Sequence, residues 1–150
     1  MGSEMCIRDS VLPALIRRFY EAKESGAESV ICWGTGSPRR EFLHVDDLGD
    51  ACVFALENWK PSTENHQFLN VGSGIDLTIR ELAESIAENI GYLGKIIWDE
   101  SKPDGTPKKQ LDISKLQNLG WSASIPLSEG LQNAISAFRS EKEKNTIRSN

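Results

Sequence analysis

Several features that define common protein classes are missing from this sequence of 150 residues. It has no run of about 18 consecutive apolar residues, so the sequence predicts no transmembrane helix. Basic residues do not outnumber acidic ones, and the net charge is -5, which is not typical of a protein that binds nucleic acid or a membrane surface. The first residues do not form a charged and then apolar leader, and we therefore expect a cytoplasmic protein.

Cysteine and histidine are also scarce. Cys6, Cys32 and Cys52 are widely spaced and form no C-x-x-C motif, a pattern that favours reduced thiols over a disulfide framework. Cys32 and Cys52 lie in apolar runs, and we predict that both are core residues. Neither His44 nor His66 has an evident nucleophile partner, so a hydrolytic triad is not indicated, and we interpret His44 as a structural histidine.

Two phosphate-loop fingerprints and one catalytic motif are absent as well. There is no G-x-G-x-x-G or G-x-x-x-x-G-K-[ST] pattern, and no Tyr-x-x-x-Lys, because Tyr20 and Tyr92 each have a lysine only three residues later. The turn Gly72-Ser73-Gly74 stands between a predicted strand and a predicted helix, where phosphate loops occur. Since it lacks both fingerprints, the sequence predicts a structural turn there.

The hydrophobic share of 39% suffices for one domain with a real core, and strand and helix patterns alternate along it, which predicts an α/β fold. Period and breaker residues predict helices over 11–23, 48–58, 79–90, 113–119 and 127–139, and strands over 29–33, 67–71 and 95–99. Thr78 and Glu81 have the spacing of a capping box. Asp46 or Asp47 is expected to cap the helix over 48–58, which explains this pair better than a metal site does. Residues 1–10 are polar and aperiodic, so we expect a foreign tail before a domain over 11–140, and a frayed tail over 141–150.

The segment over 33–47, WGTGSPRREFLHVDD, is the most informative part of the sequence. Its glycines and proline require a chain reversal between Trp33 and the adjacent Arg39 and Arg40. Such a loop can place an aromatic face and guanidinium groups around a ligand that carries phosphate or carboxylate oxygens. The alternative is an ordinary surface turn with solvated arginines. The basic, proline-containing loop over 101–109, SKPDGTPKK, is a second place for a phosphate, or otherwise a charged linker.

Several of these segments together resemble one enzyme family. They are VLPALIRRF over 11–19, the segment over 33–47, LNVGSG over 69–74, TIRELA over 78–83 and the loop over 101–109. Together they are similar to the C-terminal half of the GDP-L-fucose synthase family, within the extended short-chain dehydrogenase/reductase group, also described as the NAD-dependent epimerase/dehydratase family. The resemblance covers about 11–139. It implies a Rossmann-type fold of which this chain supplies the substrate-binding part, without the N-terminal cofactor half.

The resemblance also implies a reaction. Enzymes of this family convert GDP-4-keto-6-deoxy-D-mannose to GDP-L-fucose by 3,5-epimerisation and NADPH-dependent 4-reduction. Their N-terminal half holds NADP and the Ser and Tyr-x-x-x-Lys set, and the complete enzyme is expected to be a homodimer. Ser10 stands where the family has a histidine, so we expect no catalytic residue in this chain and no activity of the chain alone.

By the same resemblance, specific residues are expected to meet the GDP-sugar. Arg18, Trp33 and Arg40 match substrate contacts, Lys109 a phosphate contact, and Asp104 a residue directed at the nucleotide or its ribose, while Val11, Leu15 and Cys32 match apolar walls near the nucleotide. Arg39 is expected to face solvent. The missing half is expected to pack against 48–71, so the chain alone exposes apolar surface there and is expected to aggregate. Two other hypotheses are a non-catalytic nucleotide-sugar binding module and part of a sister enzyme, such as a UDP-sugar 4-epimerase or a GDP-mannose dehydratase.

Overall fold

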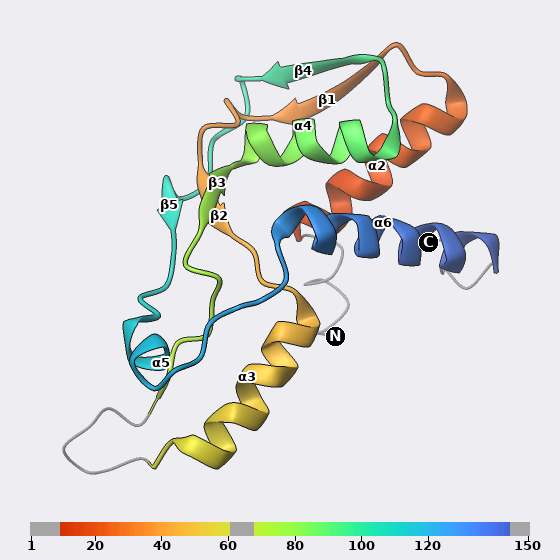
Figure 1. Ribbon diagram of the computed structural model, residues 1–150. Helices are drawn as coiled ribbons and strands as arrows, with labels where there is room; N and C mark the ends of the chain where they lie inside the picture. Colours follow the sequence, from red (N-terminus) through yellow and green to blue (C-terminus); the bar gives the residue numbers. More distant parts are fainter. Residues whose placement is uncertain (1–9, 61–67, 145–150) are drawn as a thin grey trace, which may run out of the picture.

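A computed structural model describes residues 10–60 and 68–144 of the chain (Figure 1). Five helices and five strands make up this described part, in an α/β arrangement. The helices are α2 (Val11–Ser25), α3 (Val45–Asn58), α4 (Ile79–Ile90), α5 (Ser114–Asn118) and α6 (Leu127–Glu143). The strands are β1 (Ser29–Trp33), β2 (Arg39–Glu41), β3 (Asp76–Thr78), β4 (Lys95–Asp99) and β5 (Lys108–Lys109).

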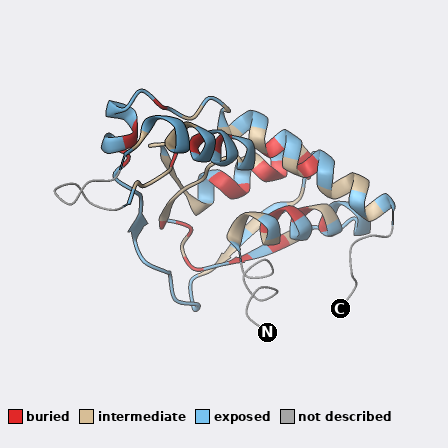
Figure 2. Ribbon diagram, turned by 90° about the horizontal axis from the view of Figure 1, so that it is seen from below, coloured by how far each residue is buried: buried red, intermediate tan, exposed pale blue. Residues whose placement is uncertain are grey.

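The main core lies between a two-stranded parallel sheet and three helices. Strands β1 and β4 pair in parallel, with Ser29 opposite Lys95, and α4 packs against both α2 and α6 beneath them (Figure 1). Phe19, Leu82 and Ile86 are fully buried at the centre of this core. Figure 2 shows that the buried positions gather on the facing sides of the helices, as expected of amphipathic segments.

A second, smaller sheet has the strand order β3-β2-β5. Strand β2 runs antiparallel to β3 and parallel to β5, with Arg39 opposite Lys108 and Arg40 opposite Lys109. The sequence pattern did not predict β3 or β5, because strands of three and two residues show no measurable alternation. This sheet joins the main core to α3 and α5 at the other end of the molecule (Figure 1).

Carboxylates fix helix α3 to the segment that leads into α6. Asp47 is buried and accepts hydrogen bonds from the N–H groups of Ser124 (3.1 Å) and Ile125 (3.0 Å) and from the Ser124 hydroxyl (2.9 Å). Burial alone would raise the pKa of Asp47, but these hydrogen bonds together lower it below its usual range. One turn further on, Asp50 accepts a hydrogen bond from the indole N–H of the buried Trp121 at 2.8 Å.

Most sequence predictions of secondary structure are confirmed, including the capping box of Thr78 and Glu81 and the left-handed Gly26 that ends α2. Helix α3, however, begins at Val45, three residues earlier than predicted, and its N-cap is His44 rather than an aspartate. The His44 ring accepts the Asp46 N–H at Nδ1 (3.2 Å), which agrees with a structural histidine.

Three other predictions about the fold are wrong. Residues 68–71 do not form a strand; the rest of that predicted strand lies outside the described residues. Helix α6 continues to Glu143, four residues beyond its predicted end at 139. Cys52 is exposed, although Cys32 is buried as predicted, because Cys52 lies on the side of α3 that faces away from the rest of the chain. The predicted tail over 1–9 and most of the tail after 143 lie outside the described residues.

The exposed side of α3 is an apolar stripe, which we define as Val45, Leu48, Cys52, Val53 and Leu56. Their spacing places them on one side of the helix, opposite the buried Asp47 and Ala51. Leu56 is 86% exposed and Val45 is 71% exposed. The predicted exposure of apolar surface in this region is therefore confirmed.

A separate observation concerns membranes. Within the part of the chain that the structure describes, no helix combines the length and apolar character needed to cross a bilayer.

Candidate functional site

A small pocket lies where the loop after β1 meets the loop over 101–107. Its volume is about 200 Å³, and it is lined by Val11, Trp33, Gly36, Pro38, Arg40, Ile79, Pro103, Asp104 and Gly105. Four of the residues predicted from the sequence to bind a ligand, Val11, Trp33, Arg40 and Asp104, therefore come together from three separate segments. Because pockets for whole small-molecule ligands usually measure about 300–1,000 Å³, this one suits part of a larger, extended ligand.

Trp33 supplies the aromatic face of this pocket. It is the last residue of β1, and its side chain is 68% exposed, which is unusual for so large an apolar group. The ammonium group of Lys102 lies 5.9 Å from the centre of the indole ring. Gly34, which follows Trp33 in the chain, has a φ of 78°, and a Cβ atom at this position would collide with the Asp104 carboxylate. The glycine therefore permits the close approach of the loops on which Trp33 and Asp104 stand.

The four basic residues of β2 and β5 divide between the two faces of the small sheet. Consecutive strand residues point to opposite faces, and paired residues on neighbouring strands point to the same face. Arg40 and its partner Lys109 therefore share one face, and Arg39 and Lys108 share the other. We call the pair Arg40 and Lys109 the cationic face.

On the opposite face, one acid pairs with both basic residues. Asp76 on β3 lies 2.9 Å from a guanidinium nitrogen of Arg39 and 3.2 Å from the Lys108 ammonium group. The hydrogen bond from Arg39 is the main reason why the pKa of Asp76 is lowered. The Arg39 side chain is nevertheless 41% exposed, which agrees with the prediction that it faces solvent. Its ion pair with Asp76 is not evident from the sequence, because the two residues are 37 positions apart.

One nitrogen of the Arg40 guanidinium group is held by hydrogen bonds, and the other two are free within the described residues. Its Nη1 donates to the carbonyls of Thr106 and Arg39, each at 2.7 Å. Within the described residues, Nη2 and Nε have no hydrogen-bond partner, and Lys109 has no acidic partner. The cationic face thus presents two positive groups whose charge the described part of the chain does not neutralise, and such groups suit a phosphate or carboxylate ligand.

Four predicted site residues do not line this pocket, and one of them, Lys109, lies opposite Arg40 in the small sheet. Arg18 is exposed on α2 and donates from Nη1 to the Ile31 carbonyl at 2.9 Å. Leu15 and Cys32 are buried in the main core rather than in the pocket wall. Burial raises the pKa of the Cys32 thiol, although Arg18 and Arg80 act in the opposite direction. The structure thus brings together Val11, Trp33, Arg40 and Asp104, with Lys109 beside Arg40, and leaves Arg18 at the edge.

The turn Gly72-Ser73-Gly74 is a structural turn, as the sequence predicts. Glu41 accepts the Gly74 N–H at 2.6 Å with one carboxylate oxygen and the Leu111 N–H at 3.0 Å with the other. A Cβ atom at Gly72 would collide with the same carboxylate. An acid of the chain itself thus accepts the Gly74 N–H, so this turn does not offer that group to the pyrophosphate of a dinucleotide cofactor.

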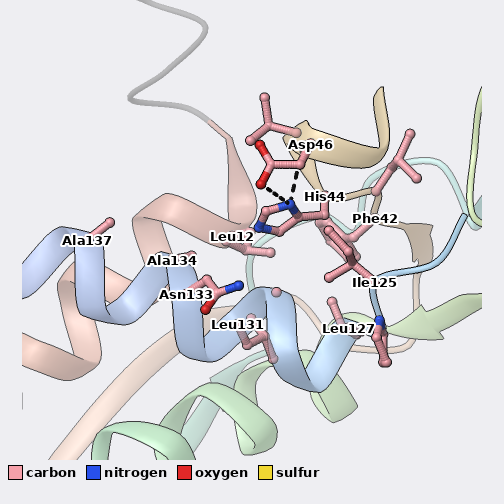
Figure 3. Close-up of a pocket in the computed structure, with 14 residues that line it drawn as sticks. Leu12, Phe42, His44, Asp46, Ile125, Leu127, Leu131, Asn133, Ala134 and Ala137 are labelled. Carbon is pink, nitrogen blue, oxygen red and sulfur yellow. Dashed lines mark hydrogen bonds and ion pairs between the residues drawn. The ribbon is translucent and has the colours of Figure 1, made fainter. Parts of the chain in front are cut away.

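A second cavity, of about 380 Å³, is apolar (Figure 3). Leu12 of α2, Phe42 and His44 before α3, and Leu127 and Leu131 of α6 contribute to its walls. Its few polar side chains include the His44 ring and Asn133. It is close to the apolar stripe, since Val45 belongs to both. No group of three or more metal-ligating side chains occurs among residues 10–60 and 68–144.

The chain is similar to known proteins. The model of the NAD dependent epimerase/dehydratase family matches residues 4–72. The chain is 57% identical over 121 residues to "Probable GDP-L-fucose synthase 1" of Oryza sativa subsp. japonica, covering 81% of this chain and 36% of that protein. It is 45% identical over 139 residues to "GDP-L-fucose synthase" of Escherichia coli (strain K12), covering 89% of this chain and 43% of that protein.

The chain is similar to members of the NAD-dependent epimerase/dehydratase family. A crystal structure of a GDP-6-OMe-4-keto-L-xylo-heptose reductase from C. jejuni superposes with a TM-score of 0.77 at 31% identity, covering 87% of this chain and 48% of that one. The predicted fold, an α/β part of an extended short-chain dehydrogenase/reductase, is thus confirmed. The chain spans 36% to 43% of the length of the two relatives named above.

Proposed function

We propose that this chain is the GDP-sugar-binding part of a GDP-L-fucose synthase. The observation that carries the proposal is the position of the cationic face beside the exposed indole of Trp33. A nucleoside diphosphate requires both features, a flat surface for the base and cations for the diphosphate. The similarity to proteins named GDP-L-fucose synthase favours guanine and a deoxyhexose as the two ends of the ligand.

The site divides between the parts of the ligand. The indole of Trp33 stacks on guanine, and aromatic stacking on a base contributes about 1–3 kcal/mol. The free nitrogens of Arg40 and the Lys109 ammonium group bind the diphosphate through charge-assisted hydrogen bonds of about 1.5–3 kcal/mol each. Val11 completes the site on the side of α2, with Arg18 at its edge. The pocket of about 200 Å³ holds one part of this ligand, and the remainder extends along the surface.

The remainder of the enzyme supplies catalysis in this proposal. The N-terminal half binds NADP and provides the Ser/Tyr/Lys set, so that the complete enzyme epimerises GDP-4-keto-6-deoxy-D-mannose at C3 and C5 and reduces its C4 ketone. The apolar stripe of α3 and the residues that line the apolar cavity of Figure 3 pack against that half. The chain alone is inactive, with Ser10 at the position of the family's histidine. A cytoplasmic homodimer of the complete enzyme is part of the same proposal.

The proposal is tested by titrating the full 150-residue chain with GDP and recording the indole N–H signals of its four tryptophans by NMR. The Trp33 signal is expected to shift on binding. The Trp121 signal is an internal control, because its N–H is held by Asp50 in a separate, buried cluster. Signals that stay unchanged at millimolar GDP, or a shift of Trp121 without Trp33, contradict the proposed site. A preference for UDP over GDP favours a sister UDP-sugar enzyme instead.

A further inference from the structure

Thr35 lies in the loop after β1, and each of its polar groups makes a hydrogen bond. Its N–H donates to Oδ1 of Asp104 at 2.9 Å, and its hydroxyl donates to Oδ2 of the same carboxylate at 2.7 Å. Its carbonyl accepts a hydrogen bond from Nη2 of Arg80 on α4 at 2.5 Å. Three segments of the chain, the loop after β1, the loop over 101–107 and helix α4, are therefore joined at a single residue.

The direction of the remaining hydrogen bond follows from the inventory of protons. A hydroxyl has one proton and two lone pairs, and the proton of the Thr35 hydroxyl is given to Asp104. In the contact of 2.5 Å between the Thr35 and Ser37 hydroxyls, Ser37 must then be the donor. The Ser37 N–H, at 3.1 Å, occupies the second lone pair. The N–H and the hydroxyl of Thr35 thus have no polar capacity left for a ligand.

Arg80 and two glycines complete the arrangement. The Arg80 guanidinium group lies 4.6 Å from the centre of the Trp98 ring, so stacking on the end of β4 fixes its direction. A Cβ atom at Gly36 would lie 2.7 Å from the same ring, and a Cβ atom at Gly34 would collide with Asp104. Trp33 precedes this loop and Arg40 follows it, and both line the pocket.

We infer that Thr35, Asp104 and Arg80 are positioning residues, and that Asp104 acts on the ligand through Thr35 rather than by direct contact. Both carboxylate oxygens already accept a hydrogen bond from Thr35, and these bonds lower the pKa of Asp104. The carboxylate keeps the loop over 101–107, which leads to Lys109, next to the loop that presents Trp33. This inference rests on the proposed nucleotide site and adds to it the groups that fix the distance between its aromatic and cationic parts.

The matched variants are Thr35→Val and Thr35→Ser in the full 150-residue chain. Valine keeps the branched shape but removes the hydroxyl, whereas serine keeps the hydroxyl and loses only a methyl group. We expect the Kd for GDP, measured by calorimetry, to rise about tenfold in Thr35→Val and to stay within about twofold in Thr35→Ser. Hydrogen exchange of the ligand-free chain is expected to be faster over 34–37 and 101–107 in Thr35→Val alone, a result that does not depend on GDP.

A double-mutant cycle separates a positioning role of Asp104 from direct contact. If Asp104 acts through Thr35, the double variant of Asp104→Ala and Thr35→Val weakens GDP binding by less than the product of the two single effects. If Asp104 touches the nucleotide independently, the two effects multiply, and the inference is overturned. It is also overturned if GDP binds to the unaltered chain and Thr35→Val binds it as tightly as Thr35→Ser. If the unaltered chain does not bind GDP, the proposed function itself is overturned. Faster hydrogen exchange in Thr35→Val would then still show that Thr35 holds the two loops together, so the two failures can be told apart.

Discussion

The two adjacent lysines of β5 allow a matched test of the cationic face, because each substitution removes one positive charge from one face of the small sheet. Lys109 shares a face with Arg40, and Lys108 is paired with Asp76 on the other face. A charge-assisted hydrogen bond is worth about 1.5–3 kcal/mol, but Lys109 is exposed, and exposed pairs are weakened by solvent to about 1 kcal/mol or less. A loss of about 1 kcal/mol corresponds to a roughly fivefold rise in Kd.

We therefore expect Lys109→Gln to raise the Kd for GDP about fivefold and Lys108→Gln to change it by less than about twofold. Calorimetry at low salt measures both values, and the difference is expected to shrink in about 1 M salt, where the Debye length falls to about 3 Å. Circular dichroism at each step checks that the variants are folded. Equal effects of the two substitutions, or an unchanged affinity in Lys109→Gln, would refute the assignment of the two faces.

Three further predictions concern the fold. Asp47→Asn is expected to lower the free energy of unfolding, measured in urea at pH 7, by about 1–3 kcal/mol. Because the pKa of Asp47 is lowered in the folded chain, its contribution to stability is present above about pH 4 and is lost as the pH falls through the folded-state pKa. The stabilities of the variant and the unaltered chain should therefore converge in acid. Leu56→Lys on the apolar stripe should reduce aggregation measured by light scattering, whereas Leu93→Lys, at an isolated residue that is 99% exposed, should not; equal effects would contradict the role of the stripe. Gly72→Ala should lower the melting temperature, because its Cβ atom would displace the Glu41 carboxylate, and an unchanged value would contradict that contact.

The parts of the fold that the sequence predicted well are those governed by local patterns. Helix α4 combines a regular apolar period with the capping box of Thr78 and Glu81 and ends at Gly91 in the left-handed conformation, and its predicted bounds are those observed. Strands β1 and β4 are short apolar runs between breakers, and both were predicted correctly. The start of α3 was misplaced because a histidine, which is seldom considered an N-cap, occupies that position.

The contacts that distinguish the candidate site residues are long-range and were not predictable from local patterns. Asp76 and Arg39 are 37 residues apart, and Asp104 and Thr35 are 69 residues apart, so neither pairing leaves a local signal. The family resemblance implied that Arg40 contacts the substrate and that Arg39 faces solvent, but local patterns gave no direction for either side chain. Only the pairing of β2 with β5 shows that one of them faces Lys109 and the other an acid.

The central claim is that this chain binds the guanosine diphosphate part of its ligand through Trp33 and the cationic face. The most direct test is calorimetric titration of the full 150-residue chain with GDP and, separately, with UDP. The account predicts one GDP bound per chain and at least about tenfold weaker binding of UDP, since the smaller pyrimidine covers less of the indole. Equal affinity for the two nucleotides, or no binding of GDP at millimolar concentration, would contradict it.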